Sequence, residues 1–293
     1  TKVKVIGLCH GHYGYLEVAR RLGLDPARVT WEAPGVNHAI WLTTFLHDGE
    51  DAYPILDRWI TDEAPDFWAT HVAQRTHDIQ MSRGVIDMYN LYGLMPIGDT
   101  PRQVGWWYHT DADTKLRWFG PPWGGPDTDT ARPVHVQQLT ERLAQVDAVL
   151  KDESAQVTSV FGRERTREQQ VPIIDAIANG VANCFQVNVP NSAGILKGVA
   201  EDVVVEGQAW IDRGGVHPMR PARPLPARIF REEVAPKIDE MERGLEAFLT
   251  GDRRLILLDI LADPRTRSRE QAEGVLKALL EMPGHEEAAA HFK

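Results

Sequence analysis

The spacing of apolar and polar residues along the chain predicts a mixture of helices and strands. Apolar residues recur every three or four positions in some segments, as in amphipathic helices, whereas β-branched or alternating runs are typical of strands. Helices are predicted over residues 15–22, 54–60, 85–91, 134–151, 171–178, 227–249, 253–261 and 268–281, and strands over residues 3–7, 29–33, 184–189 and 202–211. This mixture indicates an α/β or α+β fold.

Other segments depart from these patterns. The uncharged apolar run at residues 39–42 predicts that the segment 35–45 is buried. Residues 62–76 are polar and irregular, so an exposed excursion is expected there. Proline and glycine predict loops over residues 95–101 and 118–132. Pro236 lies inside the long carboxyl-terminal helical pattern and should kink or divide that helix.

Composition excludes several classes of protein. A chain of 293 residues with 43% hydrophobic content can form a substantial core, and its formal charge of -10 speaks against nucleic-acid binding. No run of 18 apolar residues predicts a membrane span, and the amino terminus lacks the apolar segment of a signal peptide. Only two cysteines are present, Cys9 and Cys184, so we expect a reducing, cytoplasmic environment and not a disulfide scaffold.

Three glycines near the amino terminus suggest a dinucleotide-binding loop, but their spacing is wrong. Gly7, Gly11 and Gly14 form G-x-x-x-G-x-x-G, whereas the fingerprint is G-x-G-x-x-G. No acidic residue follows at a predicted strand end about 20 residues later, where the ribose contact is expected. The glycines are better explained as sharp turns that direct Cys9 and His10 toward one ligand.

A small group of loop residues carries the candidate chemistry. Cys9 and His10 follow the first predicted strand, Asn37 and His38 lie near the buried run, and Asp99 lies in a glycine–proline loop. Thiolate and imidazole together suit a borderline-soft divalent metal, and ligands on loops favour an open, catalytic site. A single cysteine or histidine is more often a core residue, so the grouping carries the prediction.

Three short motifs resemble glycoside hydrolase family 4, and within it the α-glucosidase branch. They are CHGHYG at residues 9–14, GVNHAIWL at residues 35–42 and MPIGDTPR at residues 95–102. The resemblance continues through residues 123–125, 187–191 and 245–252, and so covers nearly the whole chain. Cys-His-Gly in place of Cys-Asn-Val-Pro argues against the branch that acts on phosphorylated sugars. The resemblance implies the carboxyl-terminal domain of a lactate/malate-dehydrogenase-like fold.

The resemblance also implies an unusual mechanism, because enzymes of this family depend on NAD and do not use a pair of carboxylates. NAD⁺ removes a hydride from C3 of the sugar, the ketone acidifies the proton on C2, and the glycosidic oxygen leaves from C1. Water then adds and the hydride returns. A divalent metal, typically Mn²⁺, holds the oxygens on C2 and C3, and Cys9 and His38 match its protein ligands.

Further site residues are assigned by the same resemblance. His10 occupies the position of the acid that protonates the leaving group, which suits the near-neutral pKa of histidine. Asp99 occupies the position of the base that removes the C2 proton. Arg102 matches a residue near the cofactor. Asn37 is expected to bind a sugar hydroxyl or to orient His38.

The chain departs from the family in one respect, since the amino-terminal nucleotide-binding domain is absent. We therefore expect residues 1–293 to form a single substrate- and metal-binding domain of a larger enzyme, active as a homodimer or homotetramer on a small α-glucoside. On its own the chain should bind NAD weakly. An α-galactosidase, an α-uronidase and a catalytically incomplete sugar-binding or oligomerising fragment remain as alternatives. A simple malate- or lactate-dehydrogenase relative is disfavoured by the Cys/His pair.

Overall fold

The computed structural model describes residues 4–164 and 168–293, so Val3 of the strand predicted over residues 3–7 lies outside the described residues. Contacts within the chain gather in two compact units. The first unit comprises Thr1–Gln103 and Asp111–Leu225, and the second comprises Val104–Thr110 and Pro226–Lys293. All the candidate site residues belong to the first unit.

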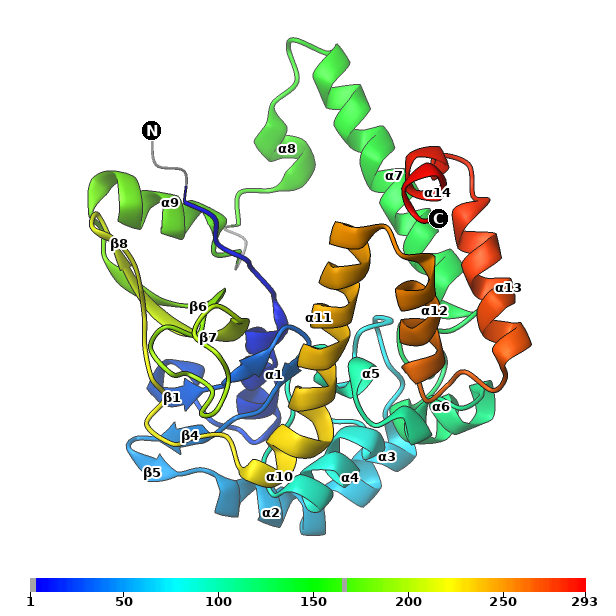
Figure 1. Ribbon diagram of the computed structural model, residues 1–293. Helices are drawn as coiled ribbons and strands as arrows, with labels where there is room; N and C mark the ends of the chain where they lie inside the picture. Colours follow the sequence, from blue (N-terminus) through cyan, green and yellow to red (C-terminus); the bar gives the residue numbers. More distant parts are fainter. Residues whose placement is uncertain (1–3, 165–167) are drawn as a thin grey trace. The chain divides into compact units, whose positions relative to one another are not determined.

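The first unit contains a five-stranded antiparallel sheet (Figure 1). Its order is β3 (Ala39–Ile40), β2 (Gly35–Val36), β7 (Val204–Asp212) and β6 (Asn183–Pro190), with β8 (Gly215–Pro218) also paired to β7. The strands β6 and β7 confirm the predictions over residues 184–189 and 202–211. Helix α9 (Gln170–Asn179) packs against both of them.

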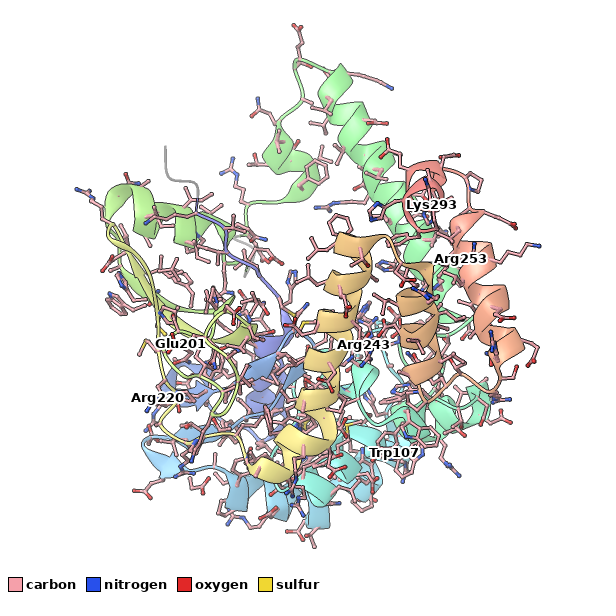
Figure 2. All side chains as sticks on the ribbon, viewed as in Figure 1. Trp107, Glu201, Arg220, Arg243, Arg253 and Lys293 are labelled. Carbon is pink, nitrogen blue, oxygen red and sulfur yellow. The ribbon has the colours of Figure 1, made fainter. Side chains whose placement is uncertain are left out.

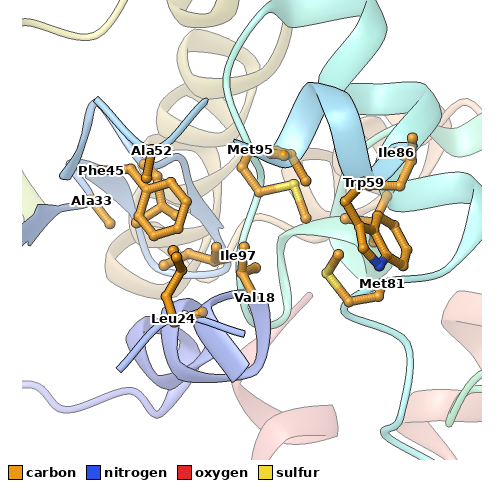
Figure 3. Packing of buried hydrophobic residues seen from close by; sticks show 14 of the residues in the cluster. Val18, Leu24, Ala33, Phe45, Ala52, Trp59, Met81, Ile86, Met95 and Ile97 are labelled. Carbon is orange, nitrogen blue, oxygen red and sulfur yellow. The ribbon is translucent and has the colours of Figure 1, made fainter. Parts of the chain in front are cut away.

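A smaller antiparallel sheet and four helices enclose the main hydrophobic core. The sheet has the order β1 (Val29–Glu32), β4 (Thr44–His47) and β5 (Glu50–Asp51). The helices are α1 (Gly14–Arg21), α2 (Tyr53–Asp62), α3 (Ala64–Thr70) and α4 (Arg83–Tyr92). Figure 3 shows the packing of this cluster, in which Phe45 of β4, Trp59 of α2, and Met95 and Ile97 of the loop after α4 are buried side chains. The apolar run predicted to be buried is buried, since Trp41 and Leu42 are each 0% exposed.

Two expectations from the sequence were wrong. Residues 4–7 form no strand beyond one bridge of Gly7 to Asn188, because Val5, at 89% exposure, has nothing to pack against. The expected excursion at residues 62–76 contains α3, in which Pro65 occupies the first turn. Phe67 and Trp68 pack against the core, and this burial stabilises a helix that the irregular polar pattern hid.

The first unit also contains shorter helices and one long one. They are η1 (Gly11–Tyr13), η2 (Pro26–Arg28), α5 (Thr100–Gln103), α6 (Ala112–Phe119), α7 (Ala131–Lys151) and α8 (Val157–Phe161). Helix α7 buries Ala131, whereas its apolar residues Val136, Leu139 and Leu143 are exposed.

The second unit is helical. Its elements are η3 (Trp106–Tyr108), α10 (Ala227–Ile229), the π-helical turn η4 (Phe230–Val234), α11 (Ala235–Thr250), α12 (Arg253–Ala262), α13 (Arg269–Leu280) and α14 (Glu286–His291). The predicted division near Pro236 is confirmed, because this residue lies in the first turn of α11, which follows the π-helical turn directly. The amide of Arg253 donates to the carbonyl of Lys293 at 3.3 Å, and both residues are labelled in Figure 2.

The mixture of helices and sheets confirms the expected fold class. Across the two described ranges, no helix has both the length and the apolar character that a membrane span requires. Cys9 and Cys184 are both free thiols.

Candidate active site

Asp99 and His38 lie side by side although 60 residues separate the loops that carry them. Asp99 Oδ2 is 3.7 Å from His38 Nε2. The neighbouring Thr100 makes the connection, because its buried Oγ1 accepts a bond from the amide of Ile40 at 2.9 Å and donates to the carbonyl of Ile40 at 3.0 Å. A threonine side chain thus takes the place of a strand partner and fixes Asp99 beside the β2–β3 turn.

The backbone of His38 adopts a left-handed conformation, with φ at 64°. His38 is the second residue of the two-residue turn between β2 and β3, a position at which positive φ normally favours glycine or asparagine. Strained residues of this kind cluster at functional sites. Asn37, the first residue of the turn, is exposed, and its side chain makes no hydrogen bond in the described parts of the chain.

The loops of Cys9 and Asp99 meet through two glycines. A Cβ atom on Gly98 would lie 2.1 Å from Gly11 Cα, and Gly98 has φ of 64°. Only glycine allows this close approach of one backbone to another. Gln80 clamps the same loop, because its Nε2 donates to the Pro96 carbonyl at 2.9 Å and its Oε1 accepts from the Gly98 amide at 2.8 Å.

Arg102 orients the Asp99 carboxylate. Its Nη1 donates to Asp99 Oδ1 at 2.7 Å, while Nε and Nη2 form a two-pronged pair with Asp127 at 2.7 and 2.8 Å. Partial burial lowers the pKa of Arg102, but the bonds and charges of Asp127 and Asp99 outweigh this and raise it. The residue expected near the cofactor is therefore anchored to the candidate base.

Cys9 lies in a negatively charged environment. Burial, together with the charges of Glu206 and Asp99, raises the pKa of its thiol to about 12, although the Gly11 amide bonded to Sγ at 3.4 Å acts in the opposite direction. A thiol in this environment stays protonated at neutral pH. A nearby divalent cation reverses that preference, because thiolate is the form that binds metal.

Glu206 is the buried carboxyl group behind this site, and the sequence patterns did not single it out. It lies on β7 opposite Gly35 of β2 and Asn188 of β6, and it is 1% exposed. Its Oε1 is 3.5 Å from Gln186 Nε2, whereas its Oε2 is buried and has no hydrogen-bond partner. Burial raises the pKa of Glu206 to about 8, and the charge of Asp99 contributes to the rise.

These donors fit Mn²⁺ as an open site. In the described ranges, no three His, Cys, Asp or Glu side chains are close enough together to enclose a metal. A sulfur from Cys9 and a nitrogen from His38 would therefore need oxygens from a substrate to complete the coordination, as in other catalytic metal sites. The carboxylate of Asp99 supplies negative charge that favours a divalent cation, and the buried, unpartnered oxygen of Glu206 would add to it once this group loses its proton.

His10 and His12 lie in contrasting environments. His10 is exposed, and its Nδ1 is 2.7 Å from Glu168 Oε1. No hydrogen bond or ion pair joins it to Cys9 or Asp99 in the described segments. Burial lowers the pKa of His12 to about 4, so this ring is neutral, and its Nδ1 lies 3.1 Å from the Cys9 carbonyl, to which it donates. His12 therefore supports the Cys9 loop, whereas His10 is free to meet a ligand.

His77 interacts electrostatically with Arg102 and Asp99, and the sequence patterns missed it. Partial burial and the charge of Arg102 lower its pKa, and the charges of Asp99 and Asp127 act in the opposite direction. Its Nδ1 is 3.0 Å from Thr76 Oγ1, and its ring lies 6.0 Å from that of His135 on α7. Nothing in the spacing around this residue marked it, because it follows the segment expected to be an irregular excursion.

Comparison with known proteins places the chain in a family. Residues 33–266 match the description "Family 4 glycosyl hydrolase C-terminal domain". The α-galacturonidase of Lachnoclostridium phytofermentans is 23% identical over 301 residues, which cover 96% of this chain and 60% of that protein.

Solved structures show the same fold. The crystal structure of lplD from Bacillus subtilis has a TM-score of 0.72 at 23% identity, over 95% of this chain and 63% of that one. A 6-phospho-alpha-glucosidase from gut microorganisms, in complex with NAD and Mn²⁺, has a TM-score of 0.68 at 18% identity, over 94% of this chain and 60% of that one. The chain thus spans less than two thirds of the length of these relatives. The fold expected from the resemblance, that of the carboxyl-terminal domain of the family, is confirmed.

Proposed function

We propose a function from the premise that the chain belongs to glycosyl hydrolase family 4. The chain is the substrate- and metal-binding portion of an α-glycosidase that oxidises its sugar transiently. The observation that carries this proposal is the Asp99 carboxylate, which Arg102 holds at 2.7 Å and which lies 3.7 Å from His38. A carboxylate fixed beside a metal-type ligand suits the removal of a proton from a carbon next to a ketone.

The residues of the chain divide the chemistry among them. Asp99 accepts the C2 proton, and His10, paired with Glu168, donates a proton to the departing glycosidic oxygen. Cys9 and His38 hold the metal, and Asn37 binds a sugar hydroxyl at the tip of its turn. When bound, NAD⁺ would accept and return the hydride at C3, and Mn²⁺ would polarise the oxygens on C2 and C3. The NAD and Mn²⁺ in the structure of the 6-phospho-alpha-glucosidase support both cofactors.

For the sugar, we propose an α-galacturonide as the first candidate and an α-glucoside as the second. The α-galacturonidase of L. phytofermentans, similar over 96% of this chain, favours a sugar acid. The motif at residues 9–14 favours the α-glucoside.

Two further proposals concern the assembly and the location of the protein. Exposed Val136, Leu139 and Leu143 on α7 are consistent with a homodimer or homotetramer that buries them. We propose a cytoplasmic location because both cysteines are free.

The test uses Cys9→Ser and Asp99→Asn. Binding of Mn²⁺ to the 293-residue chain is measured by electron paramagnetic resonance, and exchange of the sugar C2 proton with solvent deuterium is measured after addition of a nucleotide-binding domain from a relative. Cys9→Ser should weaken Mn²⁺ binding, whereas Asp99→Asn should slow C2 exchange at saturating Mn²⁺. Unchanged C2 exchange in Asp99→Asn would remove Asp99 from the role of base.

A second assay, with the nucleotide-binding domain added as before, distinguishes an enzyme from a fragment that only binds sugar. p-Nitrophenyl α-galacturonide and α-glucoside are supplied with NAD⁺, Mn²⁺ and a reductant. An enzyme releases nitrophenol from one of them, and the ratio of the two rates identifies the sugar. A fragment that only binds sugar releases none even with the added domain.

A further inference from the structure

A cavity in the first unit is lined by arginines and by none of the residues assigned to catalysis. Its volume is about 930 Å³, which suits a ligand of the size of a nucleotide or a short oligosaccharide. Its walls come from the end of α1, from α3, from residues 71–83 and from the segment around the end of α6. Five arginines line it: Arg20, Arg21, Arg75, Arg83 and Arg117.

The cavity has a surplus of positive charge, although the chain as a whole carries -10. Its two carboxylates already have partners, because Glu17 lies 3.7 Å from Arg75 and Asp78 lies 3.2 Å from His71. The other four arginines, at positions 20, 21, 83 and 117, form no ion pair within the described ranges. Uncompensated arginines gathered around a hollow create a potential that attracts anions.

Aromatic rings hold three of these guanidinium groups against the walls. The Cζ atom of Arg21 lies 4.1 Å from the centre of the Phe67 ring, and that of Arg83 lies 4.9 Å from the Trp68 ring. Arg117 lies 5.5 Å from the Trp118 ring. Stacking on a ring restricts an arginine without neutralising it, and its planar fork remains available for two-pronged bonds to carboxylate or phosphate.

The ring under Arg83 is fixed in turn, because Trp68 Nε1 donates to the Met81 carbonyl at 2.9 Å. From this geometry we propose that the cavity binds a small polyanion with at least two carboxylate or phosphate groups. Short oligouronides and organic polyphosphates share this chemistry. The site does not depend on the proposed catalytic activity.

Isothermal titration of the 293-residue chain tests the proposal with three probes: tri-galacturonate, tripolyphosphate and the neutral maltotriose. We expect saturable binding of one or both anions and none of maltotriose. The Arg21→Gln/Arg83→Gln double variant should weaken that binding roughly tenfold or more, because charge-assisted bonds are lost. Arg83→Lys, which keeps the charge but loses the fork, should fall between the double variant and the original chain.

The matched control is Arg142→Gln, which removes an arginine that also stacks on a ring, with its Cζ atom 4.5 Å from the centre of the Phe161 ring, but does not line the cavity. Anion binding should be unchanged in this variant. The tighter of the two anions identifies the class of ligand. Three results would overturn the proposal: no binding of either anion by the original chain, equal binding by the Arg21/Arg83 variant, or loss of binding in Arg142→Gln. So would self-association of the chain that the Arg21/Arg83 variant abolishes, because a second copy would then occupy the cavity.

Discussion

Replacing Glu206 with glutamine should change how the stability of the chain depends on pH. Burial raises the pKa of this carboxyl group from 4.5 to about 8. Below pH 4.5 the group is protonated in both the folded and the unfolded chain and has no effect. Between pH 4.5 and about 8 the folded chain keeps a proton that the unfolded chain has released, so the free energy of unfolding falls as pH rises. The loss is complete above pH 8.

The size of this loss follows from the shift in pKa. Each pKa unit corresponds to 1.36 kcal/mol, so the full effect is at most about 5 kcal/mol. That is a large share of the stability of an ordinary domain, about 5–15 kcal/mol. Screening by solvent does not reduce this free-energy change, because Glu206 is only 1% exposed. Glutamine has nearly the same shape and no proton to release, so Glu206→Gln lacks this loss.

The measurement is urea unfolding of the metal-free chain, treated with a chelator, at several pH values between 5 and 9. The difference in free energy of unfolding between Glu206→Gln and the original chain should grow by several kcal/mol in favour of the variant. Other titrating groups cancel in this difference. Glu201→Gln is the control, since Glu201, labelled in Figure 2, is exposed just before β7. A difference that stays flat with pH in Glu206→Gln would refute the reasoning.

Two further substitutions test how the loops are held together. Gly98→Ala should lower the free energy of unfolding by more than the about 1–2 kcal/mol that a left-handed alanine costs, because its Cβ would lie 2.1 Å from Gly11 Cα. Gly93→Ala is the control, since this residue is also left-handed but has open space around it, and it should cost only that amount. Equal losses of stability for the two variants in thermal unfolding would contradict the close approach. Thr100→Val should destabilise the chain by about 1–3 kcal/mol, because the buried Ile40 amide loses its acceptor. Hydrogen exchange at the Ile40 amide should become rapid in this variant, and unchanged protection of that amide would argue against the bond.

The sequence predicts those parts of the fold in which one local pattern decides the structure. Strands β6 and β7 follow from their β-branched runs, and the start of α11 follows from Pro236. Helix α3 escapes prediction because two aromatic side chains packed on the distant core stabilise it, and contacts between segments are not visible in a local pattern.

The candidate site divides in the same way. Cys9, His38 and Asp99 could be named because their motifs are short and specific. The contacts that bring their loops together could not be predicted, because they involve Thr100 and a pair of glycines that are far apart in the sequence. Glu206 offered one usable signal, a single acid inside an apolar strand. His77 offered none, because its position beside Arg102 depends entirely on the path of the chain.

The contact of Gly11 with Gly98 has a consequence for attempts to redesign this chain. Backbone meets backbone there, so no neighbouring side chain can be trimmed to make room for a change. The loop with the candidate metal ligand and the loop with the candidate base therefore form one transplantable unit. Exchanging either loop alone for that of a relative with another sugar preference should fail, whereas exchanging both together preserves their fit.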